Sequence, residues 1–184
     1  MKLKKSPLAP EKFPILPSIR GVNIGTSVSN SKYKSRQDIL TITFDKPASV
    51  AGVFTLSQMP AAPVLFCKKN IVNGYANALI VNAGIANSFT GKKGTENNRR
   101  IANYFSKLIN SRQKDIYICS TGVIGEQLPV PKIKKALKKS LFGKNKDFKN
   151  AAKAIMTTDT FPKGSAKTIT IDNEKISIVG IAKG

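Results

Sequence analysis

The spacing of apolar and polar residues changes several times along the chain, and each spacing predicts a type of element. Apolar and polar side chains alternate over 39–44, which predicts a strand, and a second, neighbouring strand is expected over 50–56 after a turn at Pro47. A short apolar run predicts a further strand over 64–67. The continuous apolar run over 78–82 is typical of a strand that is buried on both faces.

The middle of the chain changes to helical spacing. Apolar residues recur every three or four positions over 101–109, which predicts a helix with Thr95 as its N-cap. A strand over 116–120 follows. Pro131 at a first helical position then predicts a helix over 132–141, whose apolar stripe faces the core and whose lysines face solvent.

Regular elements are predicted near the C-terminus, and an irregular segment is predicted at the N-terminus. A shorter helix is predicted over 148–156, followed by strands over 167–171 and 175–181 that a hairpin turn at 172–174 joins. Closely spaced prolines exclude a helix or a central strand from residues 1–20, which are predicted to form an irregular N-terminal arm. No repeat or low-complexity linker divides the chain, so residues 1–184 are predicted to form a single domain of mixed α/β order.

The high positive charge raises the question of whether the chain binds nucleic acid. A net charge of +21 is typical of proteins that bind nucleic acid. Few of the 31 basic residues are arginine, however, and arginine is the side chain that phosphate and base recognition favours. Lysine-rich faces exposed to solvent are therefore the favoured interpretation, and a basic nucleic-acid-binding module that uses segment 132–153 is the alternative.

Missing residue types exclude several kinds of site. The chain has no His, which excludes imidazole as a base or metal ligand, and its dispersed acidic residues suggest no metal site. Cys67 and Cys119 lie in apolar stretches and are expected to be reduced and structural. No apolar run approaches the roughly 20 residues of a membrane span. No signal segment follows the basic N-terminus either, so a cytoplasmic protein without a membrane segment is predicted.

The segment Ser120-Thr121-Gly122 is the first candidate for chemistry. It follows a predicted strand, where Gly122 lets the backbone approach a ligand closely and the Thr121 hydroxyl can donate a hydrogen bond. Such donors suit an oxyanion hole, in which one donor can lower the barrier to acyl transfer by about 3 kcal/mol. An ordinary turn at the end of a strand explains the same residues, and spacing alone favours that explanation.

Two further polar segments and the C-terminus add candidates. Segment 82–87 places small residues between two Asn, which suits a tight loop beside a pocket. An ordinary turn whose polar groups are hydrogen-bonded explains it equally well. The Thr-Thr-Asp-Thr run at 157–160 groups four hydrogen-bonding side chains, which also suits the capped end of a helix. Lys183, the penultimate residue, would by itself be a solvated surface charge.

Several segments together resemble the ornithine acetyltransferase (glutamate N-acetyltransferase) family. They occur in the family's order, and they are Val50-Ala51-Gly52-Val53-Phe54, Ala61-Ala62-Pro63-Val64, 78–84, 118–126, 154–160 and Ile181-Ala182-Lys183-Gly184. The resemblance covers most of the chain and implies a mixed-sheet α/β sandwich. It also implies that this chain is an α-chain whose fold is completed by a β-chain from the same precursor, and that the pair dimerises to α2β2.

The resemblance implies roles for particular residues. Thr121 and Gly122 match the family's oxyanion-hole pair, and Thr157 and Lys183 match positions that bind substrate. Weaker candidates follow Thr157 in the same run; they are Thr158, Asp159 and Thr160. Ile85 stands where the family's Gly-Asn-Ala-Asn motif has its first Asn, so a polar contact near the pocket is expected to be missing.

The implied activity is a ping-pong transfer of the acetyl group of N-acetylornithine to glutamate, in arginine biosynthesis. In this family the precursor cleaves itself shortly after the Ala-Lys-Gly motif, before a Thr that becomes the N-terminal nucleophile of the β-chain. The amine of that Thr, with a pKa of about 8, can serve as the base, which fits a chain without His.

Alternatives to this activity remain open at the level of sequence. No cofactor is implied, but acetyl-CoA as a second acetyl donor separates the family's bifunctional members from its monofunctional ones, and the motifs fit both. An N-terminal-nucleophile amidohydrolase would give the acyl group to water instead of glutamate. Dependence on glutamate would separate transfer from hydrolysis.

Overall fold

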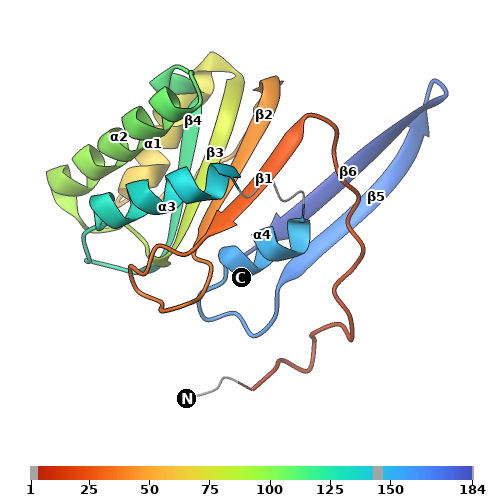
Figure 1. Cartoon of the computed structure of the whole chain (residues 1–184), viewed down its shortest axis with the longest axis horizontal. Coiled ribbons are helices and arrows are strands. Elements are labelled where there is room, and N and C mark those ends of the chain that lie inside the picture. Colours follow the sequence, from red (N-terminus) through yellow and green to blue (C-terminus); the bar gives the residue numbers. More distant parts are fainter. Residues whose placement is uncertain (1–3, 143–146, 184) are drawn as a thin grey trace.

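Four strands form the central sheet of the computed structural model, which describes residues 4–142 and 147–183 (Figure 1). Their order in the sheet is β1-β2-β3-β4. Strands β1 (Val22–Ser27), β2 (Ile39–Ser49) and β3 (Tyr75–Ile85) pair antiparallel, whereas β4 (Ile116–Val123) runs parallel to β3. The predicted α/β class with a mixed sheet is therefore confirmed.

Helices cover the sheet on both sides, and a separate hairpin follows them. The helices are α1 (Ala62–Asn70), α2 (Gly91–Leu108), α3 (Val130–Phe142) and α4 (Phe148–Ala154), with short 3₁₀ turns η1 (Ile71–Asn73) and η2 (Gln113–Asp115). The hairpin consists of β5 (Lys163–Ile171) and β6 (Glu174–Ala182), which pair antiparallel. In the described ranges, no helix is long and apolar enough to cross a membrane.

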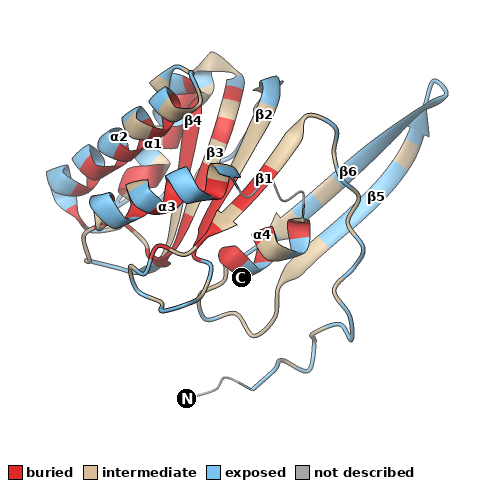
Figure 2. Ribbon diagram, in the orientation of Figure 1, coloured by how far each residue is buried: buried red, intermediate tan, exposed pale blue. Residues whose placement is uncertain are grey.

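The apolar core lies in layers on the two faces of the sheet (Figure 2). On one face, α2 and α3 bury Phe105 and Ile133 against Ile80 of β3. On the other face, Ala151 of α4 packs against Leu40 of β2, with side chains of the N-terminal arm and the β5–β6 hairpin around them. Helix α4 therefore lies between the sheet and the hairpin, and it connects the two (Figure 1).

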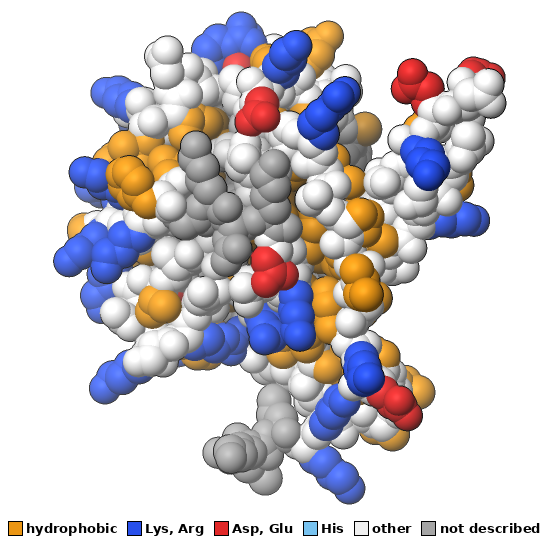
Figure 3. Space-filling model, turned by 45° about the vertical axis from the view of Figure 1, so that its right-hand side comes forward, with side chains coloured by type: hydrophobic (Ala, Val, Ile, Leu, Met, Phe, Trp, Pro, Cys, Tyr) orange, Lys and Arg blue, Asp and Glu red, His pale blue; other side chains and the backbone are white. Residues whose placement is uncertain are grey.

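Helix α3 confirms the predicted division between an apolar stripe and a basic face. Ile133, Ala136 and Leu137 are buried in the core. Most of its lysines are exposed, and on the face shown in Figure 3 the Lys and Arg side chains are spread out and not gathered into one stripe. The charge of this helix is thus accounted for by solvation of its outer face.

Helix α1 protects the free edge of the sheet. Strand β4 is an edge strand, and its outer carbonyl groups would be open to pairing with another chain. Cys67 Sγ donates to the carbonyl of Ile118 at 3.2 Å, and Asn70 Nδ2 donates to the carbonyl of Ile116 at 3.2 Å. Two side chains of α1 therefore satisfy two carbonyls of β4.

Cys67 is expected to resist alkylation in the folded protein. Burial raises the pKa of its thiol, so less of the reactive thiolate is present at pH 8 than in a free cysteine. Mass spectrometry after treatment with iodoacetamide would measure this, with the urea-unfolded protein as control. Equal labelling of Cys67 in the folded and unfolded protein would contradict the expectation.

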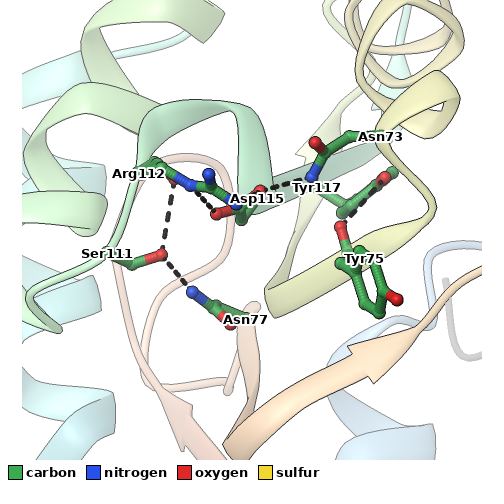
Figure 4. Close-up of polar contacts among 7 residues, drawn as sticks. All are labelled: Asn73, Tyr75, Asn77, Ser111, Arg112, Asp115 and Tyr117. Atoms are coloured by element: carbon green, nitrogen blue, oxygen red, sulfur yellow. Dashed lines mark hydrogen bonds and ion pairs between the residues drawn. The ribbon is translucent and has the colours of Figure 1, made fainter.

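A buried carboxylate fixes where β4 begins (Figure 4). Asp115, which is 2% exposed, accepts a hydrogen bond of 2.7 Å from Asn73 Nδ2 and a second of 2.7 Å from Arg112 Nε. A further bond of 2.6 Å joins Asn77 of β3 to Ser111. These bonds tie the start of β4 to the start of β3, and they support the register that brings the two strands' far ends together.

Two predicted strands are not found. Segment 64–67 belongs to helix α1, because Pro63 stands in the first turn and a short apolar run does not distinguish a strand from a helix. Segment 50–56 is not a strand, since β2 continues through an irregularity between Thr43 and Ala48 up to Ser49. Val53 and Leu56 are almost fully exposed, whereas Val50 and Phe54 pack on the core, so the apolar residues of this segment do not share one buried face.

The N-terminus of α2 also differs from the prediction. The helix begins at Gly91 with Thr90 at the N-cap position, and Thr95 lies inside it. Gly94 also lies inside the helix, at a position where a side chain would overlap the Thr90 hydroxyl. Strand β1 was not predicted, because most of its residues are polar or glycine.

Cys119 was expected to be structural, but its side chain is exposed on β4.

Other predictions are confirmed with small shifts in their bounds. The strand at 116–120 and the helices at 132–141 and 148–156 correspond to β4, α3 and α4. The hairpin turn is formed by Asp172 and Asn173, both with positive φ, which is the geometry of a tight two-residue turn. The arm lacks regular structure over residues 4–20, and residues 1–3 lie outside the described ranges.

Candidate functional site

A pocket of about 560 Å³ lies where the parallel strands β3 and β4 end. In α/β sheets, ligands are usually bound beyond the carboxyl ends of parallel strands. Loops and segments from several parts of the chain close around it. Its lining residues are Lys32, Tyr33, Ala61, Gly84, Ala86, Ser88, Ser120, Thr121, Gly122, Val123, Ile124, Thr157, Thr158 and Lys183.

Two glycines allow β3 and β4 to meet closely at the pocket. Gly84 and Gly122 face each other in the parallel register, and Gly122 has a φ of +132°. A side chain at Gly122 would overlap the backbone of Gly84 and lie 2.6 Å from the nitrogen of Ile85. The sequence therefore needs glycine here, both for its conformation and for the close approach of the two backbones.

Thr121 lies next to this contact with its side chain half-buried in the pocket wall. Within residues 4–142 and 147–183, its hydroxyl makes no hydrogen bond, so it can donate to a ligand. Its neighbour is held in place, because Ser120 Oγ donates to Asn82 Oδ1 at 2.6 Å and Asn82 Nδ2 donates to the Ile85 carbonyl at 2.8 Å. The hydroxyl of Thr121 is thus carried on a fixed backbone.

The Thr-Thr-Asp-Thr run contributes two of its four residues to the pocket. Thr157 and Thr158 line it, whereas Asp159 and Thr160 do not. The Asp159 carboxylate accepts from the Thr157 backbone nitrogen at 2.9 Å and pairs with Lys163 at 2.9 Å. Thr160 accepts a hydrogen bond from the Ser6 backbone. Asp159 and Thr160 therefore shape the segment and leave contact with the pocket to the first two threonines.

Lys183 reaches the pocket from the end of β6 and is exposed. Gly184, the last residue of the Ala-Lys-Gly motif, lies outside the described residues. The pocket lining includes a second lysine, Lys32, and no aspartate or glutamate. Lys32 is paired with Glu126 at 2.6 Å, so Lys183 is the lining charge that would favour a ligand with a negatively charged group.

Sequence reasoning missed Lys32 and Tyr33. They lie on the loop between β1 and β2, and Gly84 gives them room, since a side chain there would come within 2.8 Å of Lys32 Cβ. Arg36 of the same loop lies 4.2 Å from the centre of the Tyr33 ring and donates to the Met156 carbonyl. No local pattern marks these residues, because only the folded loop brings them to the pocket.

Ile85 does not line the pocket. Its side chain is 5% exposed and belongs to the apolar core formed with α2 and α3. The polar contact that was expected to be missing here would therefore lie in the core and not in the pocket. The pocket wall beside it is built by Gly84 and Ala86.

A buried polar network joins the two loops that border the pocket. Asn87, fully buried and with a φ of +49°, donates to the Gly94 carbonyl at 3.1 Å and to Asn98 Oδ1 at 2.8 Å. Its own Oδ1 accepts from the Thr90 hydroxyl at 2.9 Å. Gln127, from the loop after β4, donates to the Thr90 carbonyl at 3.0 Å, so the network holds the β4 loop to the β3 loop.

Replacing Asn87 with alanine is expected to destabilise the protein by about 3 kcal/mol. The change leaves buried partners of the amide without hydrogen bonds and puts a less tolerant residue at positive φ. Urea unfolding would measure the loss. Asn103→Ala on the exposed side of α2 is the matched control, because no hydrogen bond uses that side chain in the described ranges. Equal stabilities of the two variants would contradict the role of the network.

Two curated proteins of similar sequence carry the same name. A protein of Rhizobium meliloti (strain 1021), "Arginine biosynthesis bifunctional protein ArgJ", is 48% identical over 180 residues, which are 97% of this chain and 44% of the relative. The protein of that name from Brucella suis biovar 1 (strain 1330) is 46% identical over 185 residues, or 100% of this chain and 45% of the relative. The chain thus spans a little under half the length of these relatives.

Solved structures of similar fold point the same way. The crystal structure of arginine biosynthesis bifunctional protein ArgJ from Bacillus halodurans matches with a TM-score of 0.81 and 31% identity, covering 90% of this chain and 87% of that one. The structure of ornithine acetyltransferase from Mycobacterium tuberculosis in complex with ornithine matches with a TM-score of 0.83 and 29% identity, covering 90% and 89%. The expected ornithine acetyltransferase type of fold is confirmed.

A family model agrees with both comparisons. The model described as the ArgJ family matches residues 23–184, from β1 through β6 and the segment that carries Lys183. That range contains every residue of the pocket. The resemblance seen in the sequence motifs is therefore confirmed, and this chain belongs to the ArgJ family.

Proposed function

We propose that this chain is the α-chain of an enzyme that moves the acetyl group of N2-acetyl-L-ornithine to L-glutamate in arginine biosynthesis. One observation carries the proposal: a single pocket contains Thr121, Gly122, Thr157 and Lys183, which three separate segments supply. These residues offer hydroxyl donors, an open backbone and a cation. They suit a substrate that has a carboxylate and an acyl group.

The proposed mechanism is ping-pong acyl transfer with an N-terminal Thr of a β-chain as nucleophile. The Thr hydroxyl attacks the acetyl carbonyl, and its own amine takes the proton and passes it to the amide nitrogen, which leaves as the amine of ornithine. The Thr121 hydroxyl and the backbone at Gly122 stabilise the oxyanion of the tetrahedral intermediate. Lys183 binds the α-carboxylate, and Thr157 orients the substrate. The amine of glutamate then resolves the acetyl-enzyme.

The pocket needs a partner to supply the nucleophile, and the surface of the chain supports one. On one face of the hairpin, Ile171, Ile176 and Ile178 are each more than 40% exposed. The opposite face of the hairpin already packs on α4, so these exposed apolar side chains indicate that a further layer covers the outer face. The relatives are more than twice as long as this chain, and we assign that layer to a β-chain from the same precursor, in an α2β2 assembly.

Names of the relatives support the substrate class. Ornithine is bound in the Mycobacterium tuberculosis structure, and the curated relatives carry the word bifunctional in their names. We extend both to this protein: ornithine is the product of the first half-reaction, and acetyl-CoA is a second acetyl donor. The cytoplasm is the proposed location, and neither a metal nor a tightly bound cofactor takes part.

Release of ornithine from N-acetylornithine, with and without glutamate, tests the proposal. The sample is this chain produced together with the coding sequence that follows Gly184, so that a precursor can mature. Glutamate-dependent release and formation of N-acetylglutamate are the expected results. Release that ignores glutamate would indicate an amidohydrolase, and no release from a folded, cleaved complex would overturn the proposed substrates.

A further inference from the structure

An ion pair at the rim of the pocket has no part in the transfer described so far. Lys32, a lining residue, places its Nζ 2.6 Å from Glu126 Oε1. The two side chains come from different loops, one between β1 and β2 and the other after β4. Both are partly exposed, at 39% and 42%, so each charge can be reached by a ligand.

The loop that carries Lys32 is held firmly in place. Asp38 is fully buried at its end and accepts hydrogen bonds from the Ser29 backbone at 2.7 Å and the Ser29 hydroxyl at 2.6 Å. Arg36 stacks on Tyr33 and donates to the Met156 carbonyl, which lies just before Thr157. These contacts fix the loop against the segment of Thr157. Lys32 is therefore presented to the pocket by a supported loop.

The two substrates of the proposed reaction have side chains of opposite charge. N-acetylornithine and glutamate both have an α-carboxylate, but the side chain of the first ends in an ammonium group and that of the second in a carboxylate. In a ping-pong reaction both occupy the same pocket in turn. A single fixed charge at the far end would attract one substrate and repel the other.

We propose that the Lys32–Glu126 pair binds the charged end of either substrate side chain. Glu126 pairs with the ammonium of N-acetylornithine, and Lys32 pairs with the side-chain carboxylate of glutamate, while Lys183 keeps the α-carboxylate common to both. Because a partly exposed ion pair contributes little to stability, a substrate can separate it at small cost. The proposal rests on the proposed function and adds two specificity-determining residues to it.

Single variants of the pair test this in the mature complex. Lys32→Met is expected to raise KM for glutamate about tenfold while KM for N-acetylornithine changes less than about twofold. Glu126→Gln is expected to do the reverse. Lys34→Met, on the same loop outside the pocket lining, and Glu96→Gln, from an exposed pair on α2, remove the same charges and are the matched controls.

Two further measurements separate recognition from a structural role. Lys32→Arg should restore most of the affinity for glutamate, since it keeps the charge. The preference for glutamate over glutamine as acceptor should fall about tenfold in Lys32→Met, because glutamine lacks the side-chain charge. A general loosening of the loop would raise both KM values together and leave this preference unchanged.

Outcomes for the two proposals can be told apart. If the wild-type complex transfers acetyl groups but Lys32→Met and Glu126→Gln change both substrates equally, or change neither, the role of the pair is overturned and the proposed function stands. If the folded, cleaved wild-type complex transfers nothing, the proposed function fails, and the role of the pair fails with it.

Discussion

Gly122→Ala is expected to destabilise the protein by about 3 kcal/mol or more and to abolish acetyl transfer. The φ of +132° is unfavourable for any residue with a side chain, and the added carbon would overlap the backbone of Gly84. Neither strand can move away easily, because the network around Asp115 ties their starts together and Asn87 ties the loops beyond their ends. Thermal or urea unfolding, together with the glutamate-dependent assay, would measure both losses.

Gly125→Ala is the matched control for this change. Gly125, in the loop just after β4, has a φ of +85°, and nothing lies within 4 Å of where its side chain would begin. The control therefore carries the conformational penalty, of order 1 kcal/mol, without the overlap. A Gly122→Ala protein as stable and active as the control would contradict the close contact of β3 and β4 at the pocket.

The parts of the fold that local chemistry determines could be predicted from the sequence. The two residues Asp172 and Asn173 tolerate positive φ, and the hairpin they form followed from that preference. The stripe of Ile133, Ala136 and Leu137 predicted both the helix and its buried side. In each case, the residues that form the pattern also make the contacts that stabilise the element.

Elements whose patterns have more than one cause were predicted wrongly. The run at 64–67 is apolar enough for a strand, but it belongs to a nine-residue helix that has Pro63 in its first turn. Segment 50–56 has strand-like alternation, yet Val53 and Leu56 are almost fully exposed on this chain. Val50 and Phe54 of the same segment pack on the core, so its apolar residues have two different surroundings and their spacing is not that of one buried strand face.

The candidate site shows the same division. Thr121, Gly122, Thr157 and Lys183 were found through motifs that resemble a family, and the fold brings all four to one pocket. Lys32 was missed, because nothing near it in sequence is unusual and its position depends on Gly84, more than fifty residues away. Long-range packing of this kind leaves no local signal, so the charge pair at the rim is visible only in the structure.

Thr121→Ala is expected to slow acetyl transfer about a hundredfold while leaving stability nearly unchanged. Removing one preorganised donor to an oxyanion raises the activation barrier by about 3 kcal/mol. Stability should be little affected, because the hydroxyl makes no hydrogen bond in the part of the chain that the structure describes. The loss should appear in kcat and in kcat/KM to a similar extent, since an oxyanion forms only along the reaction path.

Thr121→Ser is the matched control, because it removes a methyl group and keeps the hydroxyl donor. It should retain most of the wild-type rate for both half-reactions, whereas the alanine variant should be slow in forming the acetyl-enzyme and in transferring the acetyl group to glutamate. Both steps pass through a tetrahedral intermediate, so an oxyanion donor must affect both. A folded Thr121→Ala complex with the wild-type rate, or with only one half-reaction slowed, would remove Thr121 from the oxyanion hole.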